Sequence, residues 1–447
     1  MKEKILNKII TLQESRIALF LFVISFILRF AYTIFAYFNN VMDSYGDDKG
    51  YYQLAKEIVL QGKILYNINL HQYAFAIGPG LPWINALTIL VFGQNWLGIF
   101  LVTSLASALV TLFTYKVALK VMNRPEALLA GVWSCLYLFY FKFAPTCGKD
   151  IWMALFMILI IYFLIELFYE KKFTWAKFLL FTLIYVYSFH LDERFFLLAP
   201  LLFLYILISE TYGFTRFKIA KSVYFTLLVI LLMVPWSIRN YKQHDKIVII
   251  SSRTERLTDK IFGYKSRTFE WDNIDDLYGR YYIHDYQIDS VLAGNKTVTD
   301  GGVEITEKQR QAMLKGKLPH AFKPHEAFWV RTKDLLRPFQ IGGEYQKTGY
   351  SYYSKSLRHN VASFLFYGIL FFFSFPGFYF LFKNHRKFFY LFLMTILLYT
   401  FIHSFFVPWT TWRYRLPLDA IFIIVGCLGL SVFYKAVKIR FGINSLI

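Results

Sequence analysis

About ten runs of mostly apolar residues divide the chain, and each is long enough to cross a bilayer as a helix. A transmembrane helix needs roughly 17 to 25 such residues, because each residue adds about 1.5 Å along the axis. The runs lie near residues 17–38, 95–119, 125–145, 149–169, 174–190, 193–209, 221–238, 361–382, 387–407 and 416–434. The pattern predicts an α-helical polytopic membrane protein and excludes a soluble one.

The composition agrees with this fold class. Hydrophobic residues make up 57% of the 447 residues and charged residues only 17%, whereas soluble domains carry about 45–50% and about 25%. The net charge of +20 would suggest nucleic acid as the partner of a soluble protein. In a membrane protein the same excess arises in cytoplasmic loops beside anionic lipid, so we expect membrane lipids as contacts and no nucleic acid.

Basic residues mark alternate connections between the runs and so orient the chain. The segments that they mark contain Lys2, Lys4, Lys8 and Arg16; Lys116, Lys120 and Arg124; Lys171, Lys172 and Lys177; Arg216, Lys218 and Lys221; Lys383, Arg386 and Lys387; and Lys435, Lys438 and Arg440. By the positive-inside rule these segments and both termini are cytoplasmic. With only three cysteines and no disulfide framework, we expect a bacterial plasma (inner) membrane, with the opposite face in the periplasm or outside the cell.

The predicted organisation has three parts. They are an N-terminal transmembrane module at 1–238 with a first outer loop at 39–94, an outer subdomain at 239–360, and a C-terminal transmembrane module at 361–447. A strand-like run at Ile247–Ile250 and helix-like pieces at Glu304–Lys315 and Pro324–Leu336 predict a small α+β outer subdomain.

The first outer loop contains two predicted surface helices. In Asp48–Gln61 the apolar residues recur on one helical face, and Gly62 follows as a stop. Pro82–Phe92 is apolar but too short to span, and Gly93 separates it from the next run. Both helices are expected to lie at the membrane surface.

Three carboxylates follow the first run, at Asp43, Asp47 and Asp48. A carboxylate just outside the bilayer can accept the proton of a sugar or lipid hydroxyl as a general base. The alternative is structural, because Asp47 or Asp48 can cap the helix that follows.

Cations gather at the other outer connections. They are Lys149 at the start of the fourth run, Arg194 in the turn His190–Arg194, Arg239 after the seventh run, and Arg413 and Arg415 before the last. Arginine suits bidentate phosphate binding, and a helix start favours anions. The alternatives are pairing of Arg194 with Asp192 or Glu193, an aromatic belt with snorkelling cations, and capping by Asp150.

In this order the motifs resemble those of the GT-C superfamily of integral-membrane glycosyltransferases, in the branch of the protein O-mannosyltransferases and the lipid A aminoarabinose transferase. The motifs that carry the resemblance are Asp47-Asp48 with Tyr51, Ala55 and Gly62; Gly78-Pro79-Gly80-Leu81-Pro82 leading to Phe92-Gly93; Pro235-Trp236-Ser237-Ile238-Arg239-Asn240-Tyr241; and Arg413-Tyr414-Arg415-Leu416-Pro417. The chain departs at the acidic pair, commonly Asp-Glu in the family. It also lacks the Glu-Lys-Pro-Pro run of the aminoarabinose transferases, which argues against that substrate.

The resemblance implies transfer of one sugar, with inversion, from a polyprenyl-phosphate donor to a lipid, glycan or protein acceptor on the outer face. Asp47 is then the base and Asp48 supports it. Lys149, Arg194, Arg239, Arg413 and Arg415 are candidates for the donor phosphate, and Asp43, His190 and Asp192 for the acceptor or sugar. Some relatives use a divalent metal at the acidic loop, which the sequence leaves open, and no other cofactor is expected.

The main alternative is a multi-span lipid or glycan transporter or flippase. It predicts charges near mid-membrane and internal repeats, whereas these charges gather at one face. An O-antigen polymerase or ligase is a second alternative, but an acidic pair directly after the first span is not expected of it. A non-catalytic lipid-binding protein is a third, and an inactive Asp47 variant would argue against it.

Overall fold

The computed structural model describes residues 2–39, 46–63, 78–170, 172–198, 216–244, 249–250, 269–272, 280–283, 361–406 and 412–441, with seven further residues between 307 and 336. The chain divides into two compact units. The large unit comprises residues 1–254, 369–398 and 416–447, and the small unit comprises residues 255–368 and 399–415.

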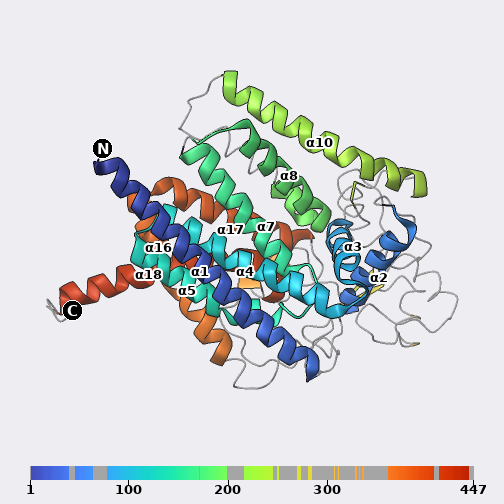
Figure 1. Cartoon of the computed structure of the whole chain (residues 1–447), viewed down its shortest axis with the longest axis horizontal. Coiled ribbons are helices and arrows are strands. Elements are labelled where there is room, and N and C mark those ends of the chain that lie inside the picture. The colour runs from blue at the N-terminus through green and yellow to red at the C-terminus, as the bar shows by residue number, and fades with distance from the viewer. Residues whose placement is uncertain are drawn as a thin grey trace. The chain divides into compact units, whose positions relative to one another are not determined.

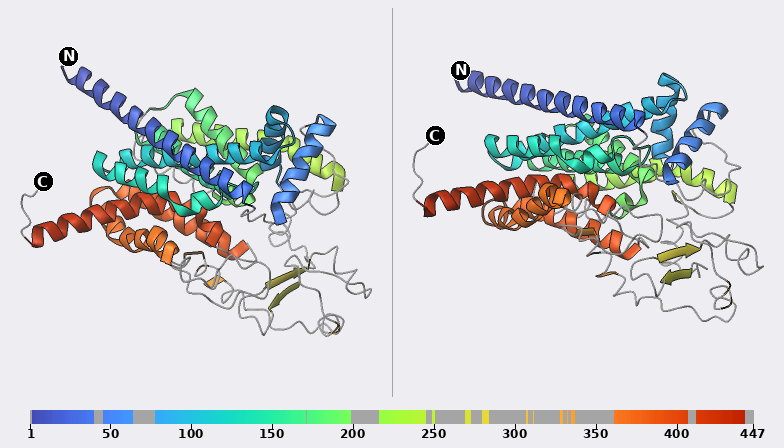
Figure 2. Two further views of the ribbon diagram at one scale, coloured as in Figure 1. Left: turned by 60° about the horizontal axis from the view of Figure 1, so that its bottom comes forward. Right: turned by 90° about the horizontal axis from the view of Figure 1, so that it is seen from below.

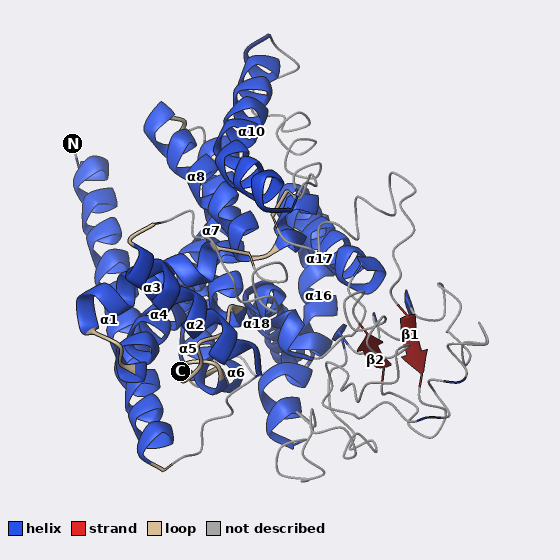
Figure 3. Ribbon diagram, turned by 90° about the vertical axis from the view of Figure 1, so that its right-hand side faces the viewer, coloured by secondary structure: helices blue, strands red, loops and turns tan. Residues whose placement is uncertain are grey.

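Seven helices among the described residues are long and apolar enough to cross a membrane. They are formed by α1 (Lys2–Phe38), α4 (Trp96–Val121), α7 (Asp150–Leu164) with its π-helical end η1 (Ile165–Tyr169), α10 (Arg216–His244), α16 (Ile369–Asn384) with the π-helical turn η5 (Phe364–Gly368), α17 (Arg386–Phe406) and α18 (Leu416–Arg440). Figure 1 labels them, and helices dominate the described chain in Figure 3. The predicted polytopic helical membrane fold is confirmed.

The other three predicted runs take shorter forms. The run at 125–145 is interrupted, because α5 (Arg124–Leu136) ends at Tyr137 and α6 (Leu138–Lys142) follows. The run at 174–190 is α8 (Trp175–Leu191), which is 17 residues long. The run at 193–209 begins with the 3-10 helix η2 (Glu193–Leu198), and residues 199–209 lie outside the described part.

The interruption after α5 is stabilised by a buried arginine. A helix end inside a bilayer leaves carbonyl groups that need donors. Arg29 of α1 donates to the carbonyl oxygen of Ser134 near the end of α5 (2.6 Å), and also to the hydroxyl of Thr111 (2.9 Å). Its guanidinium also lies over the ring of Tyr140. Arg29 therefore provides a donor for a carbonyl at the end of α5, where the chain turns toward residues 143–150.

The core of the large unit forms around α18. Every residue from Leu416 to Gly429 is buried, where the helix packs against α16, α7, α5 and α4. Backbone contact with α16 requires glycine, because a Cβ on Gly429 or Gly426 would collide with the backbone of α16 at Phe373 or Leu370. Helix packing through small residues is typical of membrane proteins.

Helices are present at both predicted places, as α2 (Gly46–Gln61) and α3 (Gly80–Phe92), and they pack against each other. The apolar face of α2 is buried, with Leu54 and Ala55 almost fully covered. Gly62 and Gly93 end the two helices with φ of 61° and 75°, a conformation that favours glycine. The sequence thus located both helices and their ends.

Two other local predictions are corrected. The seventh run does not end at residue 238, because α10 continues through Pro235 to His244. Two residues after the proline, the hydroxyl of Ser237 donates to the carbonyl of Met233 one turn earlier (3.2 Å).

The predicted strand at 247–250 is also not found, because Ile249 and Ile250 are bends and residues 247–248 lie outside the described part. Strands occur instead in the small unit, where β1 (Phe269–Asp272) and β2 (Arg280–Ile283) pair antiparallel, as Figure 2 shows. The described residues of the two predicted helical pieces are helical, and Gln311 donates to Glu307 one turn away (2.8 Å).

Candidate active site

The acidic loop contributes a buried carboxylate at the start of α2. Asp48 is 4% exposed, and its Oδ2 accepts a hydrogen bond from the backbone N–H of Cys147 (3.1 Å). Asp47 belongs to the same helical turn, but its side chain, like all of Asp43, lies outside the described residues. The contact joins residues 99 positions apart and fixes Asp48 against the segment that precedes α7.

A second carboxylate meets Asp48 at Gly148. A Cβ built on Gly148 would lie 3.2 Å from Oδ1 of Asp48 and 3.3 Å from Oδ2 of Asp150. The two carboxylates therefore flank one small space that only glycine leaves open. Asp150, in the first turn of α7, was predicted from the sequence only as a helix cap. Its place in a Gly-Lys-Asp turn beside a candidate phosphate ligand was the one sequence feature that could have indicated a role in the site.

The segment between α6 and α7 is held by polar contacts from α3 and α4. Asn85 of α3 donates to the sulfur of Cys147 (3.0 Å), and Thr103 of α4 donates to the carbonyl of Thr146 (3.2 Å). All four of these residues are nearly inaccessible to solvent. Buried polar groups with partners hold a unique geometry, so Gly148, Lys149 and Asp150 follow a fixed anchor.

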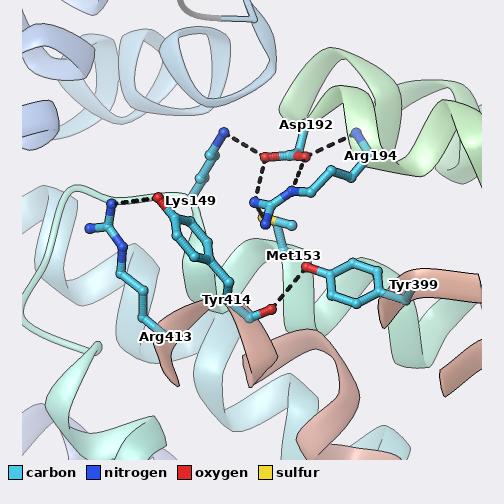
Figure 4. Close-up of polar contacts among 7 residues, drawn as sticks. All are labelled: Lys149, Met153, Asp192, Arg194, Tyr399, Arg413 and Tyr414. Atoms are coloured by element: carbon cyan, nitrogen blue, oxygen red, sulfur yellow. Dashed lines mark hydrogen bonds and ion pairs between the residues drawn. The ribbon is translucent and has the colours of Figure 1, made fainter. Parts of the chain in front are cut away.

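Lys149 and Arg194 share one buried carboxylate, drawn in Figure 4. Asp192 is 2% exposed; its Oδ2 pairs with Nζ of Lys149 (2.5 Å) and accepts from Nη2 of Arg194 (2.8 Å), while its Oδ1 accepts from Nε of Arg194 (2.6 Å). Burial alone would raise the pKa of Asp192, but Arg194 and Lys149 hold it well below its usual value. The predicted alternative, pairing of Arg194 with Asp192, is confirmed, and the three residues together carry a net charge of +1.

Two glycines bring the first outer loop against this turn. A Cβ on Gly80 would lie 2.6 Å from the backbone nitrogen of Leu191, and a Cβ on Gly78 would collide with the carbonyl of His190. The hydroxyl of Tyr187 donates to the carbonyl of Gly80 (2.6 Å) across the same contact. The Gly-Pro-Gly motif thus permits α3 to pack on the end of α8, directly before Asp192.

His190 packs in an aromatic group rather than standing alone. Its Nδ1 contacts the carbonyl of Val186 (3.1 Å), and its ring lies 5.2 Å from that of Trp83. Trp83 in turn makes an edge contact with Trp236 of α10 (5.8 Å). The role of His190 toward a sugar or acceptor stays a prediction.

Arg239 contacts the same aromatic group through Trp236. Its guanidinium stacks over Trp236 (4.6 Å), and its Nη1 donates to Oδ1 of Asn240 (2.8 Å). The indole of Trp236 and the amide of Asn240 both donate to the carbonyl of Ile250. The Pro-Trp-Ser-Ile-Arg-Asn-Tyr motif is therefore a helical surface that anchors the following segment and holds one cation.

Arg413 and Arg415 belong to the small unit, in the 3-10 helix η6 (Trp412–Arg415). Arg413 donates to the hydroxyl of Tyr414 (3.2 Å), and the backbone of Tyr414 is fixed by the hydroxyl of Tyr399 (3.0 Å), contacts also drawn in Figure 4. Arg415 is buried over the ring of Tyr367. Both side chains are held by aromatic partners, as cations near an interface often are.

A divalent metal would need several oxygen or nitrogen ligands around one point. Among the described residues, no three His, Cys, Asp or Glu side chains converge to hold an ion. Asp48 and Asp150 supply two carboxylates at Gly148, and the side chains of Asp43 and Asp47 lie outside the described part. A divalent metal at the acidic loop therefore stays a prediction of the family resemblance.

Comparison with known proteins identifies the fold. Residues 77–238 match the model of the dolichyl-phosphate-mannose-protein mannosyltransferase family, which covers less than half of the chain. The structure is similar to the crystal structure of the oligosaccharyltransferase of Archaeoglobus fulgidus in its apo form, with a TM-score of 0.53 and 15% identity over 97% of this chain and 52% of that chain. The chain has the GT-C fold.

Two further structures of the same archaeal enzyme show this fold. One is tethered to an acceptor peptide containing an NVT sequon (TM-score 0.50, 13% identity), and the other holds an inhibitory peptide and a dolichol-phosphate (TM-score 0.50, 14% identity). Both matches cover 97% of this chain and 51% of the archaeal chain. The present chain therefore spans about half the length of that enzyme. A comparison with curated proteins gives no match.

Proposed function

We propose that this chain is an inverting glycosyltransferase that moves one sugar from a polyprenyl-phosphate donor to a lipid, glycan or protein acceptor. The observation that carries the proposal is the turn Gly148-Lys149-Asp150. At Gly148 the carboxylates of Asp48 and Asp150 come together, and the next residue, Lys149, pairs with Asp192. Carboxylates suited to orienting an acceptor and a cation suited to an anionic leaving group thus lie at adjacent residues of this turn. The match to the mannosyltransferase family and the GT-C fold support the same reaction class.

In the proposed reaction the acceptor hydroxyl gives its proton to a carboxylate of the acidic pair. Asp47 is the base, and Asp48, held by the N–H of Cys147, orients the acceptor together with Asp150. The acceptor oxygen attacks the anomeric carbon as the bond from that carbon to the phosphate oxygen breaks. A single displacement inverts the configuration, and the electron pair leaves with the polyprenyl phosphate.

Cations stabilise the negative charge that develops on the leaving phosphate. Lys149 and Arg194 are the proposed ligands in the large unit, because both are buried and preorganised by one carboxylate. Arg239, Arg413 and Arg415 remain further candidates. On the predicted topology the reaction takes place at the periplasmic or exterior face, and the hydrocarbon tail of the donor stays in the bilayer.

The experiment measures sugar release from a panel of radiolabelled polyprenyl-phosphate sugars, with a membrane extract as the source of acceptor. Wild type is compared with Asp47→Asn and Asp48→Asn. A matched control is Glu57→Gln, which removes a carboxylate from a more exposed position of the same helix α2. Loss of the base should lower the rate by roughly 10²- to 10⁴-fold, while the control stays near wild type.

Two results contradict the proposal. Folded wild type that consumes no donor from the panel excludes the reaction as stated, and a transport assay would then test the flippase alternative. Full activity in Asp47→Asn excludes this residue as the base.

A further inference from the structure

We infer that Asp192 is an internal competitor of the substrate phosphate: it occupies the donors of Lys149 and Arg194 between turnovers and thereby promotes release of the polyprenyl-phosphate product. The inference rests on the proposed function, because it concerns how the same site is vacated. It assigns Asp192 a role in turnover, rather than the contact with acceptor or sugar predicted from the sequence.

The geometry of Asp192 is that of a bound anion. Both carboxylate oxygens are engaged: Oδ1 and Oδ2 receive the Nε and Nη2 edge of Arg194 (2.6 and 2.8 Å), and Oδ2 also pairs with Lys149 (2.5 Å). A phosphate uses the same planar fork of an arginine and the same ammonium group. A phosphate that takes either cation as a ligand therefore competes directly with the carboxylate.

The charges explain why such competition is useful. Two cations and one carboxylate give the cluster a net charge of +1. The donor is a phosphodiester with one negative charge, whereas the product is a monoester with about −1.5 to −2 at neutral pH. Without Asp192 the product would face two buried cations with no counter-ion, and tight product binding slows turnover.

The same unit contains a second buried carboxylate between two cations, which supplies a control. Glu166 in η1 is 7% exposed and accepts from Nζ of Lys120 (2.7 Å) and from Nζ of Lys177 (2.7 Å). It too is a buried carboxylate between two cations, but on the cytoplasmic side of the predicted topology. Lys120 also pairs with Glu170 (2.8 Å), and a purely structural effect of losing a buried carboxylate beside two cations should appear at both clusters.

The test measures binding of farnesyl phosphate, a short soluble polyprenyl phosphate, by isothermal titration of detergent-solubilised protein, with farnesol as the uncharged control. Asp192→Asn keeps the size of the side chain and removes its charge. We expect it to bind farnesyl phosphate about tenfold more tightly than wild type, because a charge-assisted competitor is lost. Inhibition of sugar transfer by farnesyl phosphate should strengthen by a similar factor, and Glu166→Gln should change neither value.

Asp192→Asn leaves two buried cations together and so needs a safeguard against misfolding. Lys149→Gln removes one cation and should weaken farnesyl phosphate binding, because Asp192 then neutralises Arg194 alone. Adding Asp192→Asn to Lys149→Gln leaves a single cation and should restore affinity toward that of wild type. A carboxylate that only supports the fold cannot produce this rescue.

The outcomes separate the inference from the proposed function. Wild type that binds farnesyl phosphate no better than farnesol contradicts the phosphate site itself. Wild type that binds it, combined with equal or weaker binding in Asp192→Asn and no rescue in the double variant, overturns the inference and leaves the proposed function in place. Equal gains in Asp192→Asn and Glu166→Gln would also overturn it, because they would reflect net charge and not competition at the site.

Discussion

Replacing Gly148 by alanine tests whether the reaction takes place between the carboxylates of Asp48 and Asp150. The added Cβ would lie 3.2 Å from one carboxylate oxygen and 3.3 Å from the other. Both distances are slightly shorter than ordinary van der Waals contact, so each carboxylate has to shift by roughly a few tenths of an ångström. Gly148 is not among the described glycines with positive φ, and its backbone should therefore accept alanine without strain.

The magnitudes follow from this geometry. The crowding is mild, so we expect a loss of about 1 kcal/mol in stability, at the low end for overpacking of a buried site. The methyl group also occupies the space between the carboxylates, and misplacement of reacting groups by up to about 1 Å can lower the rate by roughly 100-fold. Activity per folded molecule should thus fall far more than stability.

The assay combines sugar-transfer kinetics with thermal unfolding in detergent. Gly131→Ala is the matched control, because its Cβ would meet Leu21 at 2.6 Å and Tyr115 at 3.2 Å in the core. It should lose at least as much stability and keep the kcat/KM of wild type. If Gly148→Ala also keeps the wild-type kcat/KM, the space between the two carboxylates is not where the acceptor reacts.

Two further predictions concern stability. Gly429→Ala places a methyl group against the backbone of α16 at Phe373, so it should destabilise the protein by about 3 kcal/mol or more, and thermal unfolding that matches wild type would show that the helices do not touch there. The ion pairs of Asp192, whose pKa is held well below 3.8 by Arg194 and Lys149 against the effect of burial, stabilise the fold above about pH 4 and lose this contribution as the pH falls further. Thermal unfolding of wild type should therefore decline more steeply than that of Asp192→Asn between about pH 5 and pH 3, and parallel curves would contradict the assignment.

The sequence alone predicted the features that depend on neighbouring residues. Apolar length located the seven long membrane helices, the periodicity after Gly46 located α2, and Gly62 and Gly93 marked helix ends that positive φ confirms. Hydropathy could not reveal the break at Tyr137, because the run remains apolar across it. The break depends on Arg29, whose donors come from a helix more than 100 residues away.

The site required the tertiary structure for a similar reason. The sequence indicated Asp48, Lys149 and Arg194 as candidate site residues on three separate loops. Pairing of Arg194 with Asp192 was one alternative that the sequence allowed. Only packing decided that Lys149 shares Asp192 with Arg194, and that Asp150 joins Asp48 at Gly148. Composition and spacing therefore determined the membrane fold and the residue types available. The partners of each charge were decided by the close approach of α3 to α8 at Gly78 and Gly80 and by the anchoring of Cys147, because contacts between distant segments depend on how helices pack and not on local sequence.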